Sequence, residues 1–167
     1  MDADATHAQL REFIGNFGKL RALHQSIDKP MKMSETADEW LERNGREMRE
    51  RQVLRKGRYF PHSRQCYLNA FNLFNRGQGL HYCEGYTVID TCPLPVWHGW
   101  CVNEAGAILD PSVHQDRQAI YFGVVWKDSF TRRCWRTLIA QDLIGIIPNV
   151  YIFRDKKPGW LDAGVAS

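Results

Sequence analysis

The sequence lacks any run of about 20 apolar residues, the length that a membrane-spanning helix needs. Its first residues, MDADATHAQL, are acidic and polar, so they predict no secretory signal peptide. It has five cysteines, an odd number, at positions 66, 83, 92, 101 and 134, without the spacing of a disulfide-stabilised secreted domain. We therefore expect a cytoplasmic protein with reduced thiols and no membrane partner.

The sequence also lacks the CxxC and HxxxH spacings of common zinc sites. A weaker zinc pattern remains, in which His81 with Cys83 and Cys92 with His98 supply imidazole and thiolate ligands. Alternation along a strand explains the first pair equally simply. No glycine-rich phosphate-binding motif and no internal repeat is present, so we expect neither a metal nor another cofactor.

The charge is nearly balanced, because 22 Lys and Arg against 19 Asp and Glu leave a formal net charge of +3. One stretch, residues 43–58, has seven Arg or Lys and two Glu. It can be read as a surface for nucleic acid or another acidic partner, or as a solvated helix face with pairs such as Glu47 to Arg51. The small net charge favours the second interpretation.

With 167 residues and 44% hydrophobic residues, the chain suits a single domain. Residues 1–57 are expected to be a helical cover. Leu10, Phe13, Ile14, Phe17, Leu20 and Leu23 have helical spacing within residues 6–24. After Pro30, Thr36 and Glu39 form a capping box for a second helix that runs to about residue 56.

The next predicted helix carries a cysteine in its first turn. Ser63 is a suitable N-cap, which places Cys66 at the third helical position, and Gly77 ends the helix. The apolar residues Leu68, Ala70, Phe71, Leu73 and Phe74 follow with roughly helical spacing. Thiolates are stabilised at helix N-termini, so this position favours a reactive thiol.

A hairpin is predicted where two short apolar runs are separated by NEAG, with Gly106 in the left-handed loop position. A three-residue loop, 104–106, pairs Trp100 with Asp110 and His98 with Ser112. His98, Trp100 and Asp110 then project from one face of the sheet. We expect the cysteine helix to pack on that face.

Cys66, His98 and Asp110 thus supply a nucleophile, a base and a carboxylate that orients the base. Each residue alone has an ordinary structural explanation: a buried thiol, a packed imidazole or an Asp-Pro turn. Their order and their expected convergence favour a catalytic triad.

At these residues, the sequence resembles the core of papain-like and transglutaminase-like thiol enzymes over roughly residues 58–126. The segments QCYLNA, YCEGYTVI, VWHGW, ILDPS and YFGVVW further resemble small bacterial and phage proteins. The resemblance implies an α+β fold in which the nucleophile-bearing helix packs on a small antiparallel sheet. It also implies Cys66 as nucleophile, His98 as general base and then acid, and Asp110 as orienter, in a bacterial or phage-infected cell.

The sequence departs from papain-type peptidases at the glutamine that lies six residues before the nucleophile, because Phe60 occupies that position. The Cys66 N–H can supply one oxyanion donor. Candidates for the second donor are Tyr59, His62, Gln65 and Trp97.

Residues 119–126 predict another strand, and residues 127–154 a C-terminal helix and a short strand, NVYIF. Asp128 or Ser129 is expected to cap this helix. Residues 155–167 are expected to form a flexible tail. The expected core stripe of the helix comprises Trp135, Leu138, Ile139 and Leu143.

Other residues of the matched region have two interpretations each. Glu84 can line a cleft or simply alternate along a strand beside a bulge at Gly85. Trp97 and Trp100 can shield the base or stack on substrate, although at least one is expected to serve core packing.

The predicted function is therefore a cysteine-dependent acyl transfer on an amide or ester bond of a protein, peptide or small-molecule substrate. The acceptor is either water, as in a peptidase, amidase or deamidase, or an amine. The alternative is a non-catalytic interaction protein that retains the fold and binds an acidic partner or nucleic acid through its basic helix.

Overall fold

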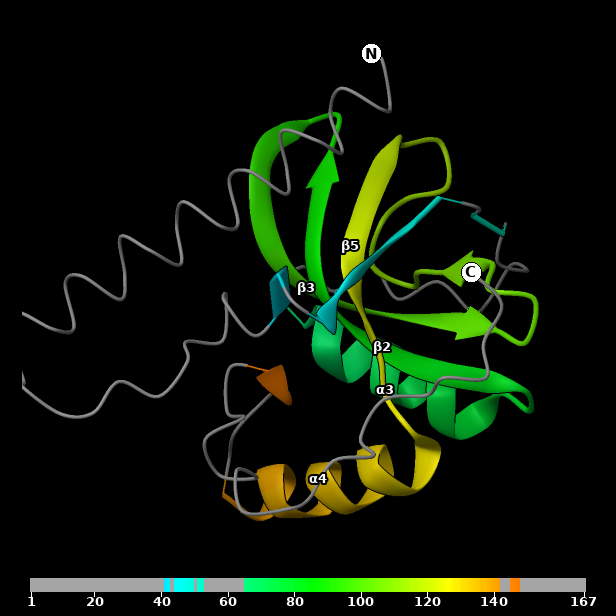
Figure 1. The fold of residues 1–167 in the computed structure, drawn as a ribbon, viewed down its shortest axis with the longest axis vertical. Coiled ribbons are helices and arrows are strands. Elements are labelled where there is room, and N and C mark those ends of the chain that lie inside the picture. The colour runs from blue at the N-terminus through cyan, green and yellow to red at the C-terminus, as the bar shows by residue number, and fades with distance from the viewer. Residues whose placement is uncertain (1–40, 43, 50, 53–64, 142–144, 148–167) are drawn as a thin grey trace, which may run out of the picture.

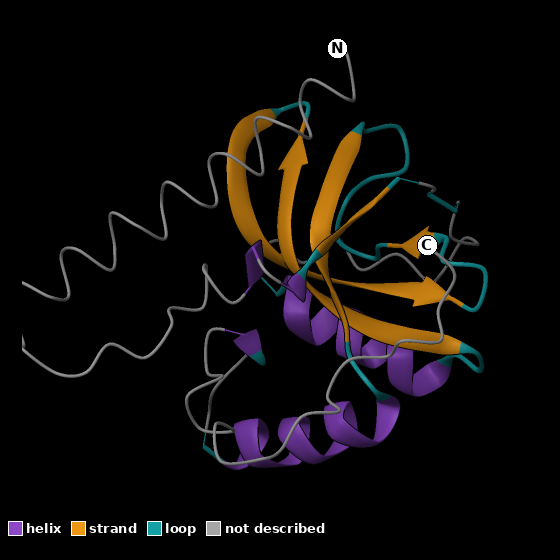
Figure 2. Ribbon diagram, in the orientation of Figure 1, coloured by secondary structure: helices purple, strands orange, loops and turns teal. Residues whose placement is uncertain are grey.

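A computed structural model describes residues 41–42, 44–49, 51–52, 65–141 and 145–147. These residues form an α+β fold, as expected, with a five-stranded antiparallel sheet and two helices (Figures 1 and 2). The elements are β1 (Arg46–Met48), α3 (Cys66–Arg76), β2 (Leu80–Ile89), β3 (Cys92–Asn103), β4 (Ile108–Leu109), β5 (Ala119–Val125) and α4 (Asp128–Ala140).

The sheet is built around a long hairpin of β2 and β3, which pair from Leu80 with Asn103 to Ile89 with Cys92. The strand order is β1-β5-β2-β3-β4, so β5 lies on the other side of β2 from β3. The predicted strand at residues 119–126 is therefore confirmed as β5. The predicted hairpin around Gly106 is also confirmed, because Cys101 pairs with Leu109 and Gly106 has a φ of 81°.

The sheet is rolled, because residues at its two edges meet. Arg51, just after β1, forms a parallel bridge with Ile108 of β4, and the Gln52 N–H donates to the Ile108 carbonyl at 2.8 Å. Since β1 and β4 are the outermost strands, this contact gives the sheet an inner and an outer face.

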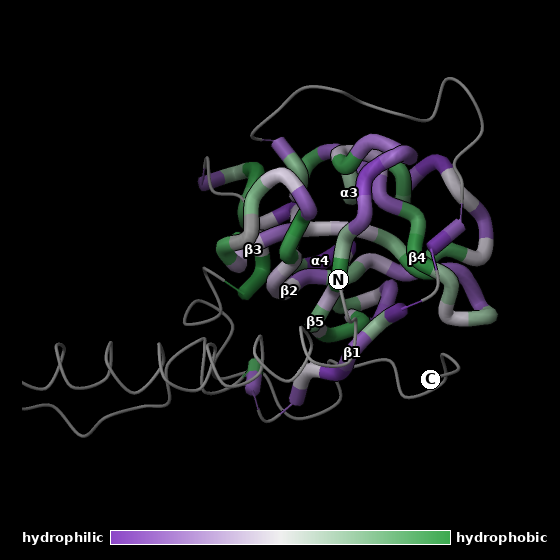
Figure 3. The backbone as a smooth tube through the Cα atoms, turned by 90° about the horizontal axis from the view of Figure 1, so that it is seen from above, coloured by the Kyte–Doolittle hydropathy of each residue, from purple (hydrophilic) through white to green (hydrophobic). Residues whose placement is uncertain are grey.

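The two faces have separate apolar clusters. Met48, Cys83, Trp100, Val102, Ile108, Tyr121 and Val125 pack on the inner face. The outer face packs against α3 and α4, as Figure 1 shows, and holds the larger cluster. Figure 3 shows hydrophobic and hydrophilic segments following one another along the backbone, and β2 and β5 are buried on both faces for most of their length.

The predicted helix over residues 36–56 is wrong at residues 46–48. Residues 46–48 are extended and pair with β5, where Met48 joins the inner cluster. The expected helical pair of Glu47 with Arg51 is consequently absent, and Glu47 instead pairs with Arg49 at 3.0 Å. Pairing along β5 has therefore overridden the local helical pattern.

Two predicted helix starts are also wrong. α3 begins at Cys66, with Gln65 as its N-cap, so the cysteine is the first helical residue and not the third. α4 begins at Asp128 after Lys127, and neither N-cap side chain makes a capping hydrogen bond. Gly77 does end α3, as predicted.

The predicted core stripe of α4 is partly confirmed. Trp135 and Leu138 are buried, whereas Ile139 is 60% exposed. Leu143, Ser63, the helix at 6–24, the strand NVYIF and the tail at 155–167 lie outside the described residues. No helix in the described ranges is long and apolar enough to cross a membrane.

Glycine at position 85 allows β2 and β5 to approach closely. A Cβ there would lie 2.2 Å from the Phe122 carbonyl oxygen and 2.5 Å from the Gly123 Cα, both in the backbone of β5. We expect Gly85→Ala to lower the free energy of unfolding by about 3 kcal/mol through overpacking, as measured by urea denaturation.

Gly77→Ala is the matched control. There the nearest atom is the flexible end of Leu80, so we expect a loss below about 1 kcal/mol. Equal losses in the two variants would contradict the overpacking explanation.

Candidate active site

Cys66 lies at the N-terminal end of α3, and its side chain is half-buried. The N–H groups of a first helical turn have no acceptor within their own helix, and they favour negative charge nearby. α3 has no acidic residue in its first turn to oppose this effect. The expectation of a thiol at a helix N-terminus is therefore met, although two residues closer to the end than predicted.

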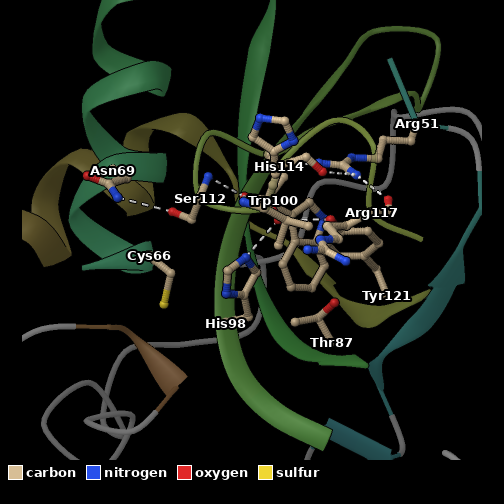
Figure 4. A network of polar contacts seen from close by, with 12 residues as sticks. Arg51, Cys66, Asn69, Thr87, His98, Trp100, Ser112, His114, Arg117 and Tyr121 are labelled. Carbon is tan, nitrogen blue, oxygen red and sulfur yellow. Dashed lines mark hydrogen bonds and ion pairs between the residues drawn. The ribbon is translucent and has the colours of Figure 1, made fainter. Parts of the chain in front are cut away.

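His98 and Asp110 form the predicted pair. His98 Nε2 donates to Asp110 Oδ2 over 2.8 Å, and both side chains are buried. The other ring nitrogen, Nδ1, faces the Cys66 thiol in Figure 4, and Cys66 also contributes to the raised pKa of His98. The imidazole therefore lies between the thiol and the carboxylate.

The Asp110 carboxylate accepts four hydrogen bonds. Oδ1 accepts the backbone N–H groups of Ser112 and Val113 at 2.8 and 3.2 Å. Oδ2 accepts the Tyr121 hydroxyl at 2.8 Å in addition to His98. These donors hold the carboxylate in one orientation toward the imidazole.

Sequence reasoning missed Tyr121, a buried residue of β5. Its only sequence signal is its place in the YFGVVW segment. Its contact with Asp110 depends on the rolled sheet, which hairpin register alone cannot reveal.

The expected packing of α3 on the His98 face is wrong. Cys101 lies on the outer face and donates to the Ala70 carbonyl of α3, whereas Trp100, its neighbour, lies in the inner cluster. His98 shares the inner face with Trp100, and their rings stack with centroids 6.3 Å apart. The thiol and the imidazole therefore come from opposite faces of the sheet.

The two meet at the edge of β3, where β4 has ended. β4 stops at Leu109, so the expected pairing of His98 with Ser112 does not form. Gly99 lets the helix approach, because a Cβ there would lie 3.0 Å from the Tyr67 Cα. Cys66 consequently reaches past β3, with its sulfur 4.0 Å from the Trp97 carbonyl oxygen.

A hydrogen bond joins α3 to the acid loop, which comprises residues 110–117 after β4. Asn69 Nδ2, one turn after Cys66, donates to Ser112 Oγ over 3.1 Å (Figure 4). Because the Ser112 N–H binds Asp110, this contact links the helix that carries the Cys66 thiol with the Asp110 carboxylate. Sequence reasoning assigned no role to Asn69.

Arg51 holds the far side of the same loop. Its guanidinium donates to the carbonyls of Val113, His114 and Arg117 (Figure 4). Part of the basic segment 43–58 therefore supports the fold of the acid loop and is not a free phosphate-binding surface.

Burial alone favours a neutral His98, but the Asp110 carboxylate outweighs it and raises the pKa of His98 to about 10. Burial likewise opposes the charge on Asp110, yet His98 and the other donors lower its pKa. The two are an ion pair at neutral pH. The stability contributed by His98 is present below pH 6.5 and lost as the pH rises through 10, and that of Asp110 is lost in acid.

The zinc alternative gains no support. Among the described residues there is no group of three or more potential ligands. His81 pairs with Asp128 at 3.1 Å. All five cysteines are described, and none forms a disulfide.

Comparisons with protein-family models, with curated proteins and with solved structures found no match to this chain.

Replacing Asp110 by Asn should lower the pKa of His98 from about 10 toward or below its ordinary value of 6.5, because burial is then opposed only by the smaller contributions of Cys66. NMR titration of the imidazole signals measures this shift. Asp128→Asn is the control, since it removes a carboxylate from the more exposed His81 pair and should leave His98 unchanged. A His98 that still titrates above pH 8 in Asp110→Asn would refute the ion pair.

The Asn69–Ser112 contact should show coupling in a double-mutant cycle. We expect Asn69→Ala and Ser112→Ala to couple by about 1 kcal/mol in unfolding free energy, the usual value for a hydrogen bond. The cycle is needed because Asn69 has further interactions that the single variant also removes. Additive losses would show that the contact contributes nothing.

Proposed function

We propose that this protein is a cysteine-dependent acyl-transfer enzyme with Cys66 as nucleophile, His98 as acid and base, and Asp110 as orienter. The observation that carries the proposal is the imidazole held between a half-buried thiol and a buried carboxylate. A helix that bears the nucleophile, followed by a strand that bears the base and then by an acid directly after the next strand, also agrees with a papain-like or transglutaminase-like core.

The charge of His98 bears on the first step. An imidazolium cannot take the thiol proton, so the reactive state is a pair of Cys66 thiolate and protonated His98. The sulfur attacks the carbonyl carbon of an amide or ester and forms a tetrahedral oxyanion. The N–H of Cys66, at the first helical position, is one donor for that oxyanion.

Collapse of this intermediate breaks the bond to the leaving group, which takes the proton from His98 Nδ1. A thioester on Cys66 remains. Neutral His98 then removes a proton from the second nucleophile, which attacks the thioester and releases Cys66. Asp110, with its four donors, keeps the ring oriented throughout.

Water is the second nucleophile that the site favours. An amine acceptor would be favoured if Trp100 excluded water from Cys66. Trp100 is instead fully buried on the inner face and does not flank the sulfur. Trp97 is half-buried beside Cys66. Because the Cys66 side chain is only half-buried, water can reach an acyl group on it, which supports a hydrolase acting on an amide or ester, such as a peptidase, amidase or deamidase.

The alternative, a non-catalytic protein that binds an acidic partner or nucleic acid through a basic helix, is less well supported. Arg46 lies in a strand, and Arg51 is engaged by three carbonyls. Neither residue therefore belongs to a continuous basic helix.

The test measures iodoacetamide labelling of all five cysteines across pH by peptide mass spectrometry. We expect Cys66 to label well below the pH at which a free thiol of pKa about 8.5 reacts. His98→Ala should remove this low-pH reactivity, and Asp110→Asn should reduce it, because each weakens the imidazolium that stabilises the thiolate.

Cys92 is the internal control, since it is also half-buried but is not bonded to an imidazole. If Cys66 labels like Cys92 and ignores both substitutions, the enzyme proposal fails. If the labelling supports the proposal, the protein is next mixed with p-nitrophenyl acetate. A mass increase of one acetyl group on Cys66, absent in Cys66→Ser, would identify the thioester.

A further inference from the structure

Glu84 is a fully buried acidic residue that the proposed reaction does not use. It lies on the outer face of β2, opposite Gly99 of β3 and Val124 of β5. Tyr67, the residue after Cys66, packs on that Gly99. Glu84 therefore lies in the layer between the sheet and the first turn of α3.

The carboxyl group binds a segment 62 residues further along the chain. Oε1 accepts the N–H of Ile146 at 2.5 Å and the Tyr82 hydroxyl at 2.7 Å, and Oε2 accepts the N–H of Ile147 at 2.6 Å. Gly145, with a φ of 80°, begins this turn in a conformation that favours glycine. Two consecutive backbone donors thus converge on one carboxyl group.

The bound segment completes the core beside the thiol. The side chains of Ile146 and Ile147 are fully buried in the outer cluster that contains Tyr67, and Cys66 packs against the same cluster. Release of residues 145–147 would therefore open this wall of the core and allow water to reach Glu84.

We infer that Glu84 is a proton-dependent latch that holds residues 145–147 against the core beside Cys66 and holds them most tightly when it is neutral. The inference does not require Cys66 to be a nucleophile. A neutral Glu84 can keep both backbone contacts: Oε1–H donates to the Tyr82 oxygen, Oε1 accepts from Ile146 through its remaining lone pair, and Oε2 accepts from Ile147.

Burial raises the pKa of Glu84 from 4.5 to about 7, although all three hydrogen bonds act to lower it. An exposed Glu84 in the released state keeps its ordinary pKa. Between pH 4.5 and 7, docking of residues 145–147 is therefore coupled to the uptake of a proton by Glu84. Its equilibrium constant is largest below pH 4.5, falls as the pH rises toward 7 and is constant above 7.

No cation among the described residues pairs with Glu84. The β3 and β5 residues beside it, Gly99 and Val124, and the bound isoleucines carry no charge. The ionisable groups that share its electrostatic surroundings are Tyr82 and Tyr86 of β2, Tyr67 and Cys66 of α3, and Cys83 on the other face of β2. Arg46 of β1 acts on Cys83, but it is not among the groups that shift the pKa of Glu84. The raised pKa of Glu84 therefore has no cation to oppose it.

The test is hydrogen exchange of the Ile146 and Ile147 amides by NMR between pH 5 and 8, as protection factors corrected for intrinsic rates. We expect protection to fall about tenfold per pH unit up to pH 7, and then to remain level. The Trp126 amide, which binds the Tyr82 carbonyl at 2.9 Å, is the control and should not follow this profile.

Two variants distinguish a latch from ordinary packing. Glu84→Gln mimics the neutral acid, so protection should not depend on pH. Tyr82→Phe removes a donor to the carboxylate, so the break at pH 7 should move up by about one unit. The second variant remains informative if Glu84→Gln fails to fold.

Wild-type protection that is independent of pH, or an unmoved break in Tyr82→Phe, would overturn the latch. Equal losses at Trp126 would do the same, because they would indicate opening of the whole domain. None of these outcomes depends on the reactivity of Cys66.

Discussion

The arrangement of the site depends on the hydrogen bonds and the ion pair made by the buried Asp110 carboxylate. It receives the imidazole of β3, the phenol of β5 and two N–H groups of its own loop. A buried charge is tolerated only where opposite charge and hydrogen-bond donors replace water. The fold therefore has to bring these elements together, and in doing so it fixes the ring of His98.

The rolled sheet explains how the Asp110 carboxylate and the Cys66 thiol can lie on either side of one imidazole although they come from different faces of the sheet. The inner face supplies His98, Tyr121 and Asp110, enclosed by the contact between Arg51 and Ile108. α3 packs outside and reaches the ring only at the edge of β3. Gly99 is the position that permits this approach, since a side chain there would meet the backbone of Tyr67. Neither face alone contains the complete triad.

Much of this site could be predicted from local sequence. Gly106 defines the hairpin loop and hence the register that brings His98 near Asp110, because register follows loop length. Tyr121 and Asn69 could not be found in this way, since their bonds cross between elements distant in the chain. The face on which α3 packs was predicted wrongly for the same reason: alternation assigns residues to faces but does not show which face a helix covers. The helix predicted around Met48 does not form there, because pairing with β5 gives Met48 a buried position in the inner cluster.

Asp110 and Glu84 show that burial alone does not determine the charge of a carboxyl group. Both are buried, and both accept two backbone N–H groups and a tyrosine hydroxyl. Their pKa values nevertheless move in opposite directions. The difference is the imidazole, because only Asp110 has a partner that becomes a cation, while all the donors to Glu84 are neutral. One carboxyl group is thereby kept charged beside His98, and the other can gain or lose a proton near neutral pH.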